Sequence, residues 1–96
     1  MSNIDTITPL IEQGQVNPVK TLLATSPIMH DDNVIIMFLQ TSIESMNFNV
    51  MHYLLDAYKP DSKSPLFHDK VSLASVSLGK TKAFKILTAY YPSIPS

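Results

Sequence analysis

The sequence predicts an all-α fold in which about three helix-turn-helix pairs stack into a short α-solenoid. Three similar segments, beginning at Gly14, Met46 and Gly79, recur with a period of about 33 residues. In each, an apolar residue precedes a lysine or histidine, and a leucine follows two positions after it. A proline ends each segment, at positions 27, 60 and 92. Such a period is typical of repeat proteins, in which each unit buries its apolar face against the next.

The three similar segments are predicted to be the second helices of the pairs. An asparagine side chain at an N-cap accepts hydrogen bonds from backbone N–H groups one turn inward. Asn17 and Asn49 are therefore predicted as N-caps, with Pro18 at the first helical position. Apolar residues then recur with helical spacing: Val19, Leu22 and Leu23 in the first copy, and Met51, Leu54 and Leu55 in the second. The prolines that follow are expected to end these helices.

The first helices are predicted ahead of these segments. The middle one is expected over residues 34–45, with Asp32 or Asn33 as its N-cap, because it is apolar nearly all round. The third is expected from Asp69 through residue 78, where alternating serines also fit a strand.

The first of these helices is interrupted by Pro9, because proline breaks the interior of a helix. We therefore expect a short helix that starts at Pro9 and is capped by Thr8, although a helix that ends before Pro9 is the alternative. The 96 residues are expected to form a single domain with approximate repeats 1–29, 30–66 and 67–96.

Composition excludes several classes of protein. The chain has no cysteine, so disulfide frameworks and thiolate zinc sites are excluded. Its longest apolar run, residues 34–39, is too short to span a bilayer and too far from the N-terminus for a signal peptide. We therefore expect a soluble, intracellular protein of the cytoplasm or nucleus, with no membrane partner.

The charges are divided unevenly along the chain. Residues 1–48 carry most of the carboxylates, whereas residues 49–96 carry six of the seven lysines. The chain has no arginine, the residue that grips phosphate and guanine with two parallel hydrogen bonds. This lack disfavours nucleic acid as a partner, and Lys80, Lys82 and Lys85 remain the residues of that alternative.

Residues 74–81 end in Gly79-Lys80-Thr81 and loosely fit a phosphate-binding loop. The sequence between Thr81 and Ser96 is too short to build the parallel sheet that such a loop requires. A nucleotide-binding domain therefore stays the weaker alternative.

His30, Asp31 and Asp32 are interpreted as a polar loop rather than a metal site. No nucleophile or carboxylate pair is spaced for catalysis, so we expect no enzyme, no cofactor and no metal.

The segment from Gly14 through Val19-Lys20 to Leu22-Leu23 resembles the second helix of the ankyrin repeat. Gly79 with Phe84-Lys85 and Leu87 is similar, and Met46 replaces the glycine in the middle copy. The family's Thr-Pro-Leu-His opening is not in register, and its Gly-Ala-Asp ending is absent. The resemblance implies ankyrin-like stacking. Another helix-pair solenoid or an irregular helical bundle stays open as an alternative.

Stacked repeats expose a continuous groove formed by their first helices and loops, and binding there depends on a few anchor side chains. We therefore expect a protein–protein interaction module, a scaffold or adaptor. Phe67 is hypothesised to be an exposed loop anchor, and packing of Leu66 and Phe67 back onto the helices is the alternative. The predicted partner-binding residues are His30, Asp31, Asn33, Gln40, Lys63, Phe67 and His68. A small helical subunit of a larger assembly is the alternative function. Further repeats or domains in a longer parent chain are compatible with this expectation.

Overall fold

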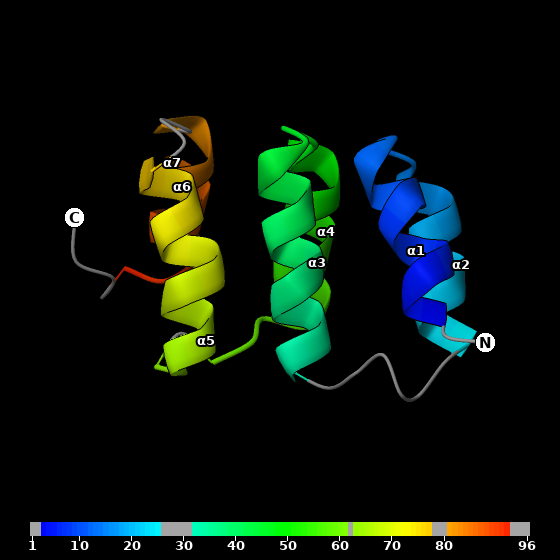
Figure 1. Ribbon diagram of the computed structural model, residues 1–96, viewed down its shortest axis with the longest axis horizontal. Helices are drawn as coiled ribbons and strands as arrows, with labels where there is room; N and C mark the ends of the chain where they lie inside the picture. The colour runs from blue at the N-terminus through cyan, green and yellow to red at the C-terminus, as the bar shows by residue number, and fades with distance from the viewer. Residues whose placement is uncertain (1–2, 26–31, 62, 78–80, 93–96) are drawn as a thin grey trace.

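The computed structural model describes residues 3–25, 32–61, 63–77 and 81–92. Within these ranges the chain forms helices, turns and loops and contains no strand, which confirms the predicted all-α class. Three helix pairs stand side by side along the longest axis of the molecule (Figure 1). The overall extents are 37 × 23 × 20 Å.

The first pair consists of α1 (Asn3–Glu12) and α2 (Val16–Thr25). The second consists of α3 (Asp32–Glu44) and α4 (Phe48–Ala57). In the third pair, the first helix is built from α5 (Pro65–Phe67), the π-helical turn η2 (His68–Ser72) and α6 (Leu73–Ser77), and α7 (Thr81–Tyr90) is the second. The second helices thus begin at positions 16, 48 and 81, which is the spacing that the sequence repeats predict.

The helices form two layers. α3 contacts α1 on one side and the α5–η2–α6 helix on the other, and these helices make up the first-helix layer. α4 contacts both α2 and α7, and these three make up the second-helix layer, which lies behind the first in Figure 1. The core fills the space between the two layers and the space between neighbouring helices of each layer. Its fully buried side chains include Ile7, Ile11, Leu23, Ile35, Ile36, Phe38, Leu39, Ile43, Met51, Leu54 and Phe67.

The turns inside the first two pairs share one backbone conformation. Gly14 and Met46 have φ values of +73° and +60°, both in the left-handed region. The Gly14 N–H donates to the Ile11 carbonyl, and the next N–H donates to a carbonyl five residues earlier. Met46 repeats this pattern with the Ile43 carbonyl. This is the Schellman ending of a helix. Gly14 and Met46, which the sequence repeats align with each other, therefore share one turn conformation.

The predicted N-caps are wrong by two residues. Asn47, not Asn49, precedes α4, and its side chain makes no capping hydrogen bond. Asn17 and Asn49 both lie inside their helices. Pro18 is the third residue of α2, where its missing N–H still costs no intrahelical bond, because the first four N–H groups of a helix have no partner within it.

The expectation that a short first helix starts at Pro9 is also wrong. α1 runs from Asn3 to Glu12 with Pro9 in its interior. Ile7 and Ile11, one turn apart, are both fully buried, whereas Pro9 is exposed. Burial of this isoleucine stripe outweighs the single intrahelical hydrogen bond that the proline removes.

The first helix of the third pair begins earlier than predicted. It starts at Pro65 rather than after Asp69, so it crosses the expected repeat boundary at residue 67. Ser64 has an extended backbone and Pro65 follows as the first helical residue, an arrangement in which the proline costs no hydrogen bond. The earlier start brings Phe67 into the core.

Candidate partner-binding surface

α3 exposes one stripe of side chains on the side opposite the core. Asn33, Met37, Gln40 and Glu44 follow one another at steps of three or four residues, which places them on one face of the helix. Gln40 is half-buried and the other three are exposed. Met37 keeps 47 % of its surface exposed, although most of the apolar residues of α3 are fully buried.

The two neighbouring helices continue this surface. α1 contributes the exposed carboxylates Asp5 and Glu12, and α6 contributes Leu73, which is 44 % exposed. We call this surface the first-layer face and define it by Asp5, Glu12, Asn33, Met37, Gln40, Glu44 and Leu73. It spans all three helix pairs, because α1, α3 and the α5–η2–α6 helix lie side by side (Figure 1).

Charge separates by layer. The helices of the first-helix layer carry five carboxylates, Asp5, Glu12, Asp32, Glu44 and Asp69, and one lysine, Lys70. Those of the second-helix layer carry three lysines, Lys20, Lys82 and Lys85, and one carboxylate, Asp56. All ten of these residues are exposed. The first-helix layer is therefore acidic and the second-helix layer basic, and each layer takes helices from both halves of the sequence.

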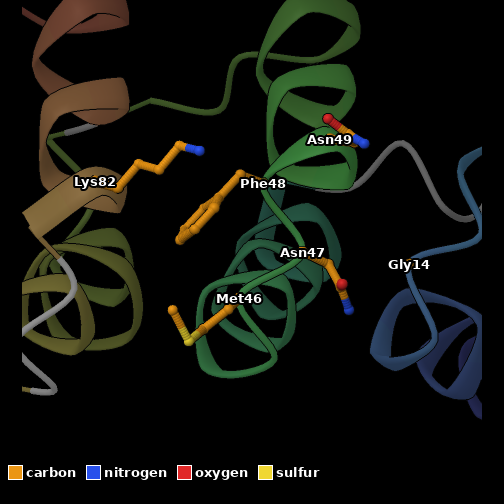
Figure 2. A pocket seen from close by; sticks show the side chains of 6 residues that line it. All are labelled: Gly14, Met46, Asn47, Phe48, Asn49 and Lys82. Carbon is orange, nitrogen blue, oxygen red and sulfur yellow. The ribbon is translucent and has the colours of Figure 1, made fainter.

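Two lysines of the second-helix layer lie over aromatic rings of α4. The Lys20 ammonium group is 5.7 Å from the centroid of the Tyr53 ring, and that of Lys82 is 5.2 Å from the centroid of the Phe48 ring. Figure 2 shows Lys82 reaching from α7 toward Phe48. These cation–π contacts link neighbouring second helices. Of the three lysines of the nucleic-acid alternative, Lys82 thus makes a contact within the fold, Lys85 is exposed, and Lys80 lies outside the described residues.

A polar chain joins α4 to α7. The Tyr90 hydroxyl donates to Asp56 at 2.5 Å, and His52 Nδ1 lies 3.5 Å from the same hydroxyl. The hydrogen bond to the carboxylate is the main cause that raises the pKa of Tyr90, because it stabilises the protonated phenol. These three hydrogen-bonding side chains lie at the surface and hold α4 and α7 together.

A small open pocket of about 240 Å³ lies at the inter-helix turns (Figure 2). Its lining residues are Gly14, Met46, Asn47, Phe48, Asn49 and Lys82. The Asn47 side chain points toward the turn of the first pair and donates to the carbonyls of Ile11 (2.7 Å) and Glu12 (2.9 Å). Asn47 thereby satisfies the last carbonyls of α1 and ties the second pair to the first. The sequence gives no signal for this role, because it depends on a residue 36 positions away.

The structure divides the predicted partner-binding residues. Asn33 and Gln40 belong to the first-layer face. Lys63 and His68 are exposed near the start of α5 and are not part of that face. His30 and Asp31 lie outside the described residues.

The prediction that Phe67 is an exposed anchor is wrong. Phe67 has no exposed surface, and its ring packs edge-on against Tyr91 with centroids 5.1 Å apart. The Tyr91 hydroxyl donates to the Pro60 carbonyl at 2.5 Å, so this aromatic pair closes the loop after α4 onto the third pair. Burial is the main cause that raises the pKa of Tyr91, and the carboxylates of Asp32 and Asp61 add to it.

Sequence reasoning missed five residues of this surface, Asp5, Glu12, Met37, Glu44 and Leu73, of which Met37 and Leu73 are apolar. Residues 34–39 form an unbroken apolar run, so the run itself does not distinguish Met37 from its buried neighbours. The spacing from Asn33 through Met37 to Gln40 is the available signal, because it places an apolar side chain on a polar stripe. Leu73 offers no such signal, because the alternating serines around it also fit a strand and so do not define a helix face.

Among the described residues, no group of three or more histidine, cysteine or carboxylate side chains is placed to hold a metal ion. No helix within the described ranges has the length and apolar character needed to cross a membrane. Comparisons with protein-family models, with curated proteins and with solved structures found no match to this chain.

Proposed function

We propose that this chain is a protein-interaction module, an ankyrin-like stack of three helix pairs whose first-layer face binds a basic, apolar segment of another protein. The observation that carries the proposal is the exposure of Met37 and Leu73 on a surface whose other defining residues are carboxylates and amides, with the exposed Lys70 about one turn before Leu73. The stacking of first helices side by side supports the ankyrin-like part of the proposal.

The chemistry of the face indicates the chemistry of its partner. Methionine is flexible and polarisable, so Met37 can adapt its shape to an incoming apolar side chain. Carboxylates at Asp5, Glu12 and Glu44 attract lysine or arginine and orient the approach of a basic segment. The apolar contacts would supply most of the affinity, and the charges would supply on-rate and orientation.

A selection from a random peptide library tests the proposal without a known partner. We expect the immobilised chain to enrich peptides that combine lysine or arginine with large apolar residues. A Met37→Asp variant should weaken binding of an enriched peptide at least about tenfold, because it removes an apolar anchor and desolvates a charge. A Glu44→Lys variant should lower the association rate and reduce its dependence on salt.

Lys85→Glu is the matched control, because it reverses an exposed charge on the opposite layer. Binding of the enriched peptide should be unchanged in this variant. Equal losses in Met37→Asp and Lys85→Glu, or enrichment of acidic peptides, would contradict the proposal. Circular dichroism of each variant checks that its helix content is that of the unmodified chain.

A further inference from the structure

The repeated architecture allows the outer surfaces of the two terminal pairs to be compared with buried surfaces inside the stack. Positions in successive pairs correspond at the same intervals as the starts of the second helices, at positions 16, 48 and 81. Ile43 of α3 thus corresponds to Val76 of α6, and Met51 of α4 corresponds to Phe84 of α7. By helical spacing, Ile43 lies on the side of α3 that faces the third pair.

These positions are covered inside the stack and uncovered at its C-terminal end. In the first pair Ile11 and Val19 have no exposed surface, and in the second pair Ile43 and Met51 have none. In the third pair the corresponding Val76 is 59 % exposed and Phe84 is only half-buried. Leu73, at the edge of the same surface, is also exposed. We call Leu73, Val76 and Phe84 the end face.

The opposite end of the stack has a polar outer surface. Phe38 and Tyr53 pack from the second pair toward the first, and Tyr53 lies under Lys20 of α2. The corresponding residues of the first pair are Thr6 and Thr21, both exposed. A polar outer surface is the usual feature of a capping repeat. The N-terminal pair therefore has the character of a cap, whereas the C-terminal pair does not.

We propose that the end face binds the end face of a second copy of this chain in a two-fold symmetric dimer. A head-to-tail assembly would place Val76 and Phe84 against Thr6 and Thr21, leaving apolar groups against polar ones. In the alternative, the end face of one copy contacts the end face of the other, and the two copies are related by a two-fold axis parallel to the helices. Such an axis exchanges the two layers and sets Phe84 of one copy against Val76 of the other. Both residues lie within one turn of the α6–α7 connection, so they are at similar heights.

The size of the end face predicts a weak dimer. The cross-section of the stack measures 23 × 20 Å, so each copy buries roughly 500 Å² if its end is covered. Stable dimers usually bury about 800 Å² per partner. The dimer is therefore expected to form reversibly and to depend on protein concentration. Leu73 is shared by the two faces, whereas Val76 and Phe84 belong only to the end face and Met37 and Glu44 only to the first-layer face. Variants at these four positions therefore distinguish failure of the dimer from failure of the proposed peptide binding.

Sedimentation equilibrium over a range of concentrations tests the dimer. The expected mass rises from that of the 10.7 kDa chain toward twice that value. Val76→Asp should weaken dimerisation at least about tenfold without changing helix content, because the side chain is already exposed. Thr21→Asp, on the polar end, is the control and should dimerise normally. A monomer at every concentration, or equal effects of the two variants, would overturn the proposal.

Cysteine cross-linking tests the arrangement of the two copies. The chain has no cysteine, so introduced thiols are unique. Oxidation of a mixture of Val76→Cys and Phe84→Cys chains should give a disulfide-linked heterodimer in high yield. A mixture of Val76→Cys and Thr21→Cys should give little. Preferential linkage in the second mixture would indicate head-to-tail contact and overturn the two-fold arrangement.

Discussion

Met46 occupies a backbone conformation that favours glycine. Its φ of +60° matches the +73° of Gly14, and both residues end a first helix with the same pair of hydrogen bonds. A side chain in the left-handed region costs about 1 kcal/mol or more, because its Cβ crowds the following carbonyl. More than half of the Met46 surface is exposed, so little packing would be lost with its side chain.

We therefore expect Met46→Gly to raise the free energy of unfolding by about 1 kcal/mol, measured by chemical denaturation. The converse change, Gly14→Ala, should lower it by a similar amount or more. An added Cβ at Gly14 would lie 2.8 Å from Asn47 Oδ1, in addition to the unfavourable φ. Destabilisation by Met46→Gly would show that the turn does not have this conformation.

Asn47 links two helix pairs through its side-chain amide. Asn47→Ala leaves the carbonyls of Ile11 and Glu12 without this donor, and we expect the free energy of unfolding to fall by about 1–2 kcal/mol. Asn47→Asp should cost more, because a carboxylate would face two carbonyl oxygens. Asn49→Ala is the matched control: Asn49 is exposed on α4, and its loss should change stability little. Equal effects of the Asn47→Ala and Asn49→Ala changes would contradict the inter-pair bond.

At the scale of the helix, two prolines occupy different environments. Pro9 lies in the interior of α1, where it removes an intrahelical hydrogen bond, whereas Pro18 is the third residue of α2, where no such bond exists. We expect Pro9→Ala to stabilise the chain by roughly 1–3 kcal/mol. Pro18→Ala should have little effect. Thermal unfolding of both variants checks the difference, and no gain from Pro9→Ala would mean that α1 does not extend through residue 9.

The second helices can be predicted well from the sequence, and the first helices less so, for physical reasons. The second helices carry their apolar spacing locally, and Gly14 marks the turn before the first of them. α1 forms against a local rule, because tertiary burial of Ile7 and Ile11 outweighs Pro9. The start of α5 cannot be predicted from the sequence. A proline at the first position of a helix, as Pro65 is, and a proline in a loop have the same local sequence pattern.

The candidate surface can be predicted only in part. Asn33 and Gln40 stand out by their polar character on an apolar helix, and the structure places both on the first-layer face. Phe67 stands beside a polar loop in the sequence, which leaves open both an exposed anchor and packing onto the helices. Its partner Tyr91 lies far along the chain. A contact that depends on the packing of distant segments leaves no local signal, and the same holds for Asn47.

At the scale of the whole molecule, two tyrosines with raised pKa values predict loss of stability at alkaline pH. The fold raises the pKa of Tyr53 to about 12, mainly by burial, and raises that of Tyr91 for the same main reason. The unfolded chain ionises its tyrosines near pH 10. A raised pKa in the folded state gives stability that is full below pH 10 and is lost as the pH rises above it.

We therefore expect the free energy of unfolding to fall above pH 10, and to fall less steeply in Tyr91→Phe. The two proteins differ only at residue 91, so the comparison isolates the contribution of Tyr91. The variant should also be about 1 kcal/mol less stable at neutral pH, because the buried Pro60 carbonyl loses its donor. Denaturation curves at pH 7, 10 and 11 check both effects. Parallel pH dependences would contradict a buried Tyr91.

The central functional claim is that the acidic first-helix layer, rather than the basic second-helix layer, is the binding surface. Amide chemical shifts recorded during titration with the best peptide from the library selection test it most directly. We expect the largest shifts at Met37, Gln40 and Leu73, with those of Lys20 and Lys85 unchanged. Shifts confined to the second-helix layer would contradict the claim.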